Sequence, residues 1–184
     1  MTAPVRTLEF QADDRVCAQI VVPLPQSAVF EKFRHDFHVW WPCEFTWSGE
    51  VLEDIFFEGR KGGMIWERGP EGIRFDMARV LRWVPPEKVV LRWHVGPDHM
   101  PEPNPNRASE VEVRFVAMDG ATRIELEHRF FLRHGKAGLE YRNLMAIQWP
   151  YILKRLADCC GGQEAQAPVA KGPQPVLRSL PALV

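Results

Sequence analysis

Apolar and charged side chains alternate with a period of two along residues 110–115 and again along residues 123–130. The dipeptide Asp119-Gly120, which favours a tight turn, separates the two runs. This pattern predicts a β-hairpin with one face in water and the other buried, so a second layer must cover the buried face. The inward positions are Val111, Val113, Phe115, Ile124, Leu126, His128 and Phe130.

The other apolar patterns predict what surrounds this hairpin. Helical spacing predicts a short helix at 27–38 and a long one at 139–160, whose apolar stripe holds Leu144, Ile147, Tyr151, Ile152 and Leu156. Tight turns require the strands to pair antiparallel, and only the long helix can cover the sheet. We therefore expect an α+β fold, a curved antiparallel sheet gripping helix 139–160. The other strands are expected at 16–22, 51–57, 64–68, 73–84 and 88–95, with an irregular loop at 98–106.

Composition divides the chain into three parts. Residues 1–15 form an N-terminal extension without the apolar stretch of a secretory signal, and residues 16–160 form one domain. Residues 161–184 are rich in Gly, Pro and Ala and show no periodicity, which predicts a flexible tail. We expect removal of residues 163–184 to leave thermal stability nearly unchanged.

Charge and cysteine content narrow the classes of partner. With 23 Lys plus Arg against 24 Asp plus Glu, the formal net charge is −1, which argues against nucleic acid or an anionic membrane surface as the main partner. No apolar run approaches the roughly 20 residues of a membrane span. The four cysteines form no CxxC motif, so we expect free thiols, no metal and no cofactor, in a cytoplasmic protein.

A family resemblance is carried by motifs spread through most of the predicted domain. On these motifs the chain resembles the SRPBCC (START-like, birch-pollen-allergen-like) superfamily, and within it the AHSA-type group related to the C-terminal domain of the heat-shock-protein-90 ATPase activator. The resemblance runs from about Val16 to Ala157 and implies a helix-grip fold. The motifs include Trp40-Trp41-Pro42, Phe57-Glu58-Gly59-Arg60, Gly62-Gly63, Trp66-Glu67-Arg68, Pro85-Pro86, Glu125-Leu126-Glu127-His128-Arg129, His134-Gly135 and Trp149-Pro150.

The chain departs from this family pattern at three places. Met77-Ala78 stands where relatives usually have a tryptophan-glycine pair, and Phe130 stands where they often have glycine. Ile147-Gln148 replaces glycines that precede the tryptophan of Trp149-Pro150. Since each change alters bulk, we expect a cavity that is reshaped or partly filled relative to the family.

The candidate site residues are polar or aromatic groups expected inside the grip. His128 is the first, because alternation places it on the buried face, either as a hydrogen-bonded core residue or as a ligand-binding or acid–base group. Glu58 and Glu67 flank the turn at 59–63 and are its candidate carboxylate partners. The expected ligand-binding residues are Trp41, Trp66, Met77, Trp93, His128 and Trp149.

Three functions follow from these expectations. The first is binding of a small hydrophobic or amphipathic molecule between the sheet and the C-terminal helix, in a space that the tryptophans either fill or wall. The second is a cyclase, dehydratase or hydrolase that uses His128 with Glu58 or Glu67. The third, implied by the resemblance alone, is regulation of a chaperone ATPase.

Overall fold

The structure is a computed structural model that describes residues 14–161. One antiparallel sheet runs in the order β1-β7-β6-β5-β4-β3-β2. Its strands are β1 (Arg15–Val22), β2 (Asp54–Phe57), β3 (Met64–Arg68), β4 (Arg74–Val84), β5 (Lys88–Trp93), β6 (Ser109–Met118) and β7 (Ala121–Arg129).

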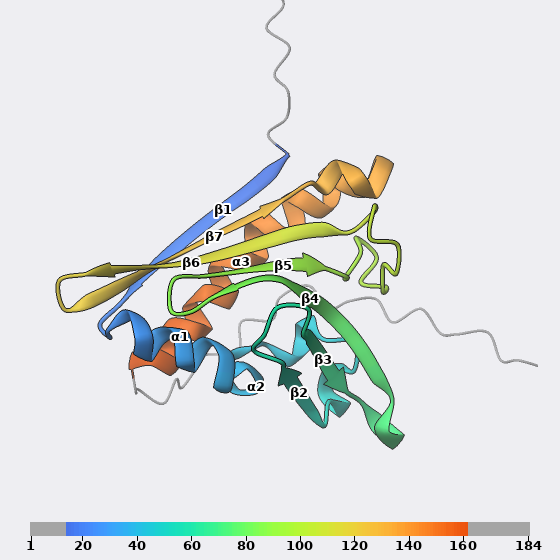
Figure 1. Ribbon diagram of the computed structural model, residues 1–184. Coiled ribbons are helices and arrows are strands. Elements are labelled where there is room, and N and C mark those ends of the chain that lie inside the picture. The colour runs from blue at the N-terminus through green and yellow to red at the C-terminus, as the bar shows by residue number, and fades with distance from the viewer. Residues whose placement is uncertain (1–13, 162–184) are drawn as a thin grey trace, which may run out of the picture.

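A long C-terminal helix crosses one face of this sheet, and the shorter helices close one end (Figure 1). The α+β helix-grip arrangement expected from the sequence is confirmed. The helices are α1 (Gln26–His35), α2 (Phe37–Trp40) and α3 (Gly138–Gly161), and the 3-10 segments are η1 (Cys43–Phe45), η2 (Gly49–Val51), η3 (Pro70–Gly72) and η4 (Phe131–Ala137).

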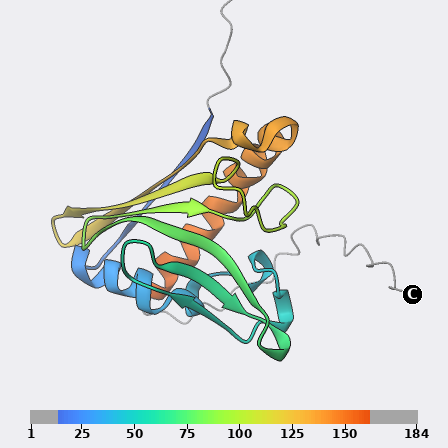
Figure 2. The same ribbon diagram turned by 45° about the vertical axis from the view of Figure 1, so that its right-hand side comes forward.

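Two irregularities in the strand pairing bend the sheet around α3. The register between β3 and β4 shifts between Ile65 and Trp66, and that between β4 and β5 shifts between Val80 and Arg82. An extra residue in one strand of a pair bends that strand and increases its twist. The β2–β4 part of the sheet therefore curls away from the β5–β7 part, as Figure 2 shows.

The predicted hairpin is formed by β6 and β7, and its apolar residues face α3. Val113 pairs with Leu126, and Phe115 pairs with Ile124, all of them buried. The second strand ends earlier than predicted, because Phe130 adopts a left-handed conformation with a φ of 70°. The ring of Phe130 lies 4.1 Å from the Arg133 guanidinium rather than in the core. The chain then continues into η4.

Helix α3 spans the predicted range but presents a different face to the sheet. Ile147 is 75% exposed and Tyr151 is 43% exposed, so the predicted stripe is wrong at both positions. The large rings of Tyr141 and Trp149 occupy the inward face, since burying them removes more apolar area from water. The buried residues of α3 include Tyr141, Met145, Trp149, Ile152, Leu153, Leu156 and Cys160.

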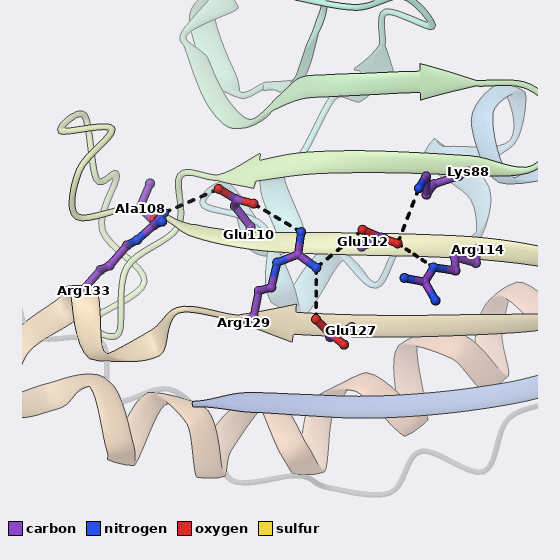
Figure 3. A network of polar contacts seen from close by, with 8 residues as sticks. All are labelled: Lys88, Ala108, Glu110, Glu112, Arg114, Glu127, Arg129 and Arg133. Atoms are coloured by element: carbon purple, nitrogen blue, oxygen red, sulfur yellow. Dashed lines mark hydrogen bonds and ion pairs between the residues drawn. The ribbon is translucent and has the colours of Figure 1, made fainter. Parts of the chain in front are cut away.

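A network of ion pairs covers the outer face of the hairpin (Figure 3). Glu112 lies at its centre, 2.5 Å from Arg114 and 3.4 Å from Arg129. Burial by itself raises the pKa of Glu112, but the hydrogen bond from Arg114 and the surrounding positive charges outweigh it. The pKa of Glu112 therefore lies below its usual value, and its carboxylate stabilises the fold at neutral pH.

We expect Glu112→Gln to reduce the free energy of unfolding by about 1–2 kcal/mol at neutral pH, because this buried carboxylate is paired with two arginines. A lowered native pKa gives stability that is present above the unfolded-state pKa and lost as pH falls through the native pKa. Urea unfolding of the parent protein and the variant should show that their difference in free energy of unfolding disappears as the pH falls through the native pKa of Glu112. Glu53→Gln, which removes a more exposed ion pair with Arg68 in another part of the sheet, is the control. A difference that does not change with pH would contradict the prediction.

Several expectations concern residues outside the described range or remain untested. The structure of residues 1–13 and 162–184, and with it the predicted extension and flexible tail, lies outside residues 14–161. No helix within that range combines the length and apolar character needed to cross a membrane. The domain boundaries and the cytoplasmic location stay predictions.

Candidate functional site

Aromatic rings fill the space between the sheet and the middle of α3. Trp41, Trp93 and Trp149 contact one another, with ring centroids 5.6–6.2 Å apart, and each is 3–4% exposed. Met77 on β4 is buried in the same core. These four predicted ligand-binding residues are brought together, but their side chains pack in the core. The centre of the grip is thus filled by aromatic packing.

His128 on β7 is fully buried in this core, and both of its ring nitrogens make hydrogen bonds. An indole N–H can only donate, so Trp149 Nε1 donates to His128 Nδ1 at 3.1 Å. The proton of the neutral ring therefore sits on Nε2, which donates to the Ser109 hydroxyl at 2.8 Å. Burial lowers the pKa of His128 well below its ordinary value, and the nearby His134 acts in the same direction. The acceptor nitrogen and the N–H group of this neutral ring both make hydrogen bonds to residues of the core.

The two glutamates predicted as partners of His128 lie elsewhere. The buried carboxylate of Glu67 accepts hydrogen bonds from the backbone N–H groups of Trp47 and Ser48, at 2.9 and 2.7 Å, and from the Ser48 hydroxyl at 2.8 Å. Glu58 is partly exposed at the turn before β3 and accepts a hydrogen bond from Arg60 at 3.0 Å. The hydrogen bonds of His128 involve neither glutamate, so the predicted acid–base pair is not formed.

Trp66, the remaining predicted pocket residue, is not part of the central core. Its neighbours Ile65 and Glu67 are fully buried, and alternation along β3 turns Trp66 to the opposite face of the sheet. There its ring stacks on Phe56 with centroids 4.1 Å apart, and the guanidinium of Arg74 lies 4.4 Å from it. The expectation that Trp66 faces Trp93 and Trp149 is therefore corrected.

A cavity of about 520 Å³ lies at one end of the grip, away from the aromatic centre. The loop that follows β5, η4 and the start of α3 surround it, and these segments gather at the same end of the molecule in Figures 1 and 2. Its volume is in the range of small-molecule sites. Apolar lining residues are Pro97, Met100, Pro101, Ala137, Tyr141 and Leu144, and charged or polar ones are Asp98, Glu102, Arg107, His134 and Glu140.

His134 in η4 is the most unusual polar group of this cavity. The residue is 6% exposed, and neither ring nitrogen has a hydrogen-bond partner within residues 14–161. Burial lowers its pKa, although the carboxylates of Glu102 and Asp98 act in the opposite direction. In the sequence, His134-Gly135 is distinguished only as part of the family resemblance. The sequence around His134 has no regular apolar spacing, so it does not predict whether this side chain is buried or exposed.

The arrangement of potential metal ligands can be examined across the described residues. Within residues 14–161, no three His, Cys, Asp or Glu side chains converge as they would around a metal ion. The cavity residues that could interact with a ligand are thus hydrogen-bonding groups, carboxylates and one guanidinium, interspersed with apolar side chains.

The family model described as "Activator of Hsp90 ATPase homolog 1-like protein" matches residues 24–161. The chain belongs to this family. It is accordingly an AHSA-type member of the SRPBCC superfamily, as the sequence motifs implied. A search of curated proteins finds no match.

Solved structures similar to this family member come from proteins with different roles. The anthrahydroquino-γ-pyrone synthase Txn09, solved with a molecule denoted SUM, is 28% identical with a TM-score of 0.58, over 79% of this chain and 96% of its own. The self-sacrificing resistance protein CalC from Micromonospora echinospora is 25% identical with a TM-score of 0.58, over 83% and 99%. Aha1 from Colwellia psychrerythraea, at 14% identity and a TM-score of 0.54 over 82% and 98%, shares the fold.

Proposed function

We propose that this protein binds a small, mainly apolar molecule in the cavity between the loop after β5 and the start of α3. The observation that carries the proposal is the cavity itself, about 520 Å³, partly open to solvent and lined by apolar and polar residues in similar measure. A space of this volume can hold a small molecule, with the apolar residues in contact with its body and the polar groups available to orient it. The proposed site lies at the end of the grip because aromatic packing occupies the centre.

The likeness to Txn09 and CalC supports a role for small molecules. One is a synthase solved with a bound molecule and the other a resistance protein, and both match this chain over nearly their whole length. Neither likeness identifies a substrate for this chain. The enzymatic alternative based on His128 receives no support, because both ring nitrogens are engaged in the core. Chaperone regulation is not proposed, since the likeness to Aha1 concerns the fold.

Blocking the cavity tests this proposal. We expect Ala137→Phe, which places a phenyl ring in the cavity wall, to weaken binding of 2-naphthol by about tenfold or more, equivalent to 1.4 kcal/mol. Equilibrium dialysis of the full chain measures the dissociation constant, and the thermal midpoint checks that the variant is folded.

Ala121→Phe is the matched control, because Ala121 begins β7 beside the hairpin turn at the opposite end of the sheet (Figure 1). It should bind 2-naphthol as the parent protein does. Equal binding by a folded Ala137→Phe variant, or no binding by the parent protein, would argue against this site.

A further inference from the structure

Two buried histidines, His128 in the central core and His134 at the cavity, differ in one decisive respect. Both ring nitrogens of His128 have partners, whereas neither nitrogen of His134 has one within residues 14–161. Leaving a buried polar group without a partner costs about 1–3 kcal/mol. Since His134 is 6% exposed and lines the 520 Å³ cavity, a molecule in that cavity can reduce this cost.

Local geometry places the His134 ring beside the cavity wall. The ring packs edge-on against Tyr141 of α3, with centroids 5.2 Å apart. Gly135, with a φ of 65° and a ψ of −138°, breaks η4 directly after it and turns the chain towards α3. Each ring nitrogen is itself covered, so contact with a ligand requires a change of side-chain rotamer, which is common on binding.

The neutral form of this imidazole sets the hydrogen bonds that it can offer. Burial is the largest influence on its pKa and lowers it, Arg107 lowers it further, and Glu102, Asp98 and Asp14 raise it. Because the net shift is downward, the ring is neutral at neutral pH and provides one donor and one acceptor. A hydroxyl group can use either, since it both donates and accepts.

The charges of the lining residues disfavour an anionic ligand. Asp98, Glu102 and Glu140 contribute three carboxylates, against the single guanidinium of Arg107. That guanidinium already pairs with Glu102 at 3.2 Å. A carboxylate or phosphate entering the cavity would meet like charges with no unpaired cation of the lining to compensate, which is unfavourable.

We infer that His134 is the ligand-recognition residue of the cavity and that the ligand class is an uncharged alcohol or phenol with an apolar body. The inference rests on the proposed function, because it presumes that the cavity binds a small molecule. The apolar body contacts Met100, Ala137 and Leu144, and the hydroxyl group exchanges a hydrogen bond with the His134 ring.

Three probes that share one ring system test this inference by equilibrium dialysis of the full chain at neutral pH. They are naphthalene, 2-naphthol and 2-naphthoate. We expect the parent protein to bind 2-naphthol at least about tenfold more tightly than naphthalene, as expected for one hydrogen bond made to a buried group. The anion 2-naphthoate should bind most weakly of the three.

Variants of His134 separate this inference from the proposed function. His134→Phe should bind naphthalene as before and lose the preference for 2-naphthol, whereas His134→Gln, which keeps a donor and an acceptor, should retain part of it. A preference for 2-naphthol that survives in a folded His134→Phe variant, or that is absent from the parent protein, would overturn the inference and leave the proposed function standing. If none of the probes binds, the proposed function fails as well.

Discussion

Replacing His128 by leucine should lower the free energy of unfolding by about 3–5 kcal/mol, among the larger effects of a single substitution. Leucine approximates imidazole in volume, so packing accounts for the smaller part of the loss. The larger part comes from the Trp149 indole and the Ser109 hydroxyl, which lose their partner at about 1–3 kcal/mol each. Denaturant unfolding at neutral pH measures the difference.

The control for this prediction is His38→Leu, because His38 is exposed in α2 and its replacement should change stability by no more than about 0.5 kcal/mol. A loss below about 1 kcal/mol for His128→Leu would mean that water reaches its former partners, as in a solvated cavity. That result would restore His128 as a candidate ligand-binding residue and contradict the packed core described above.

Replacing Glu67 by glutamine should cost about 2–4 kcal/mol, because the buried carboxyl group accepts three hydrogen bonds. A glutamine amide keeps one oxygen for Ser48 but turns an NH₂ group towards the backbone N–H of Trp47. Two donors then face each other in a buried site. Urea unfolding at neutral pH measures the loss.

Glu58→Gln is the matched control, since Glu58 lies across the same turn with a partly exposed carboxylate. Its loss should stay within about 1 kcal/mol, as for other exposed ion pairs. Equal losses for the two variants would show that the hydrogen bonds of Glu67 contribute little. Glu67 would then not be the residue that fixes the segment around Trp47 and Ser48.

The elements with a regular pattern were predictable from the sequence. The alternation over residues 110–130 located β6 and β7 and the face of His128, because side chains on a strand alternate between two environments only. Tight turns then required an antiparallel sheet, and helix α3 was found within one residue of its predicted ends. The short helix predicted at 27–38 is instead divided at Asp36 into α1 and α2.

The apolar pattern did not predict the inward face correctly where two faces of an element carry similar apolar residues. On β2 and β3, adjacent apolar residues such as Phe56 and Phe57 leave the inward face undetermined, and Trp66, expected inside the grip, lies on the opposite side. On α3, a stripe through Ile147 competes with one through Trp149, and the larger ring is the one buried.

The cavity escaped prediction because its walls come from segments without periodicity. The loop after β5 was expected to be irregular, and no local signal shows that it lies over η4 and the start of α3. His134 follows the left-handed residue Phe130 by four positions, in a segment whose geometry depends on tertiary contacts. The sequence therefore shows that residue 134 is a histidine but does not reveal the burial and the neighbouring cavity that make it a candidate site residue.

An NMR titration of the full chain with 2-naphthol most directly tests whether ligands bind at the end of the grip rather than in its centre. The methyl signals of Met100, Ala137 and Leu144 are expected to shift together with a single dissociation constant. The indole N–H signal of Trp149, held by His128 in the core, should stay in place. A titration in which the Trp149 indole shifts while the three methyl groups do not would contradict binding at the end of the grip.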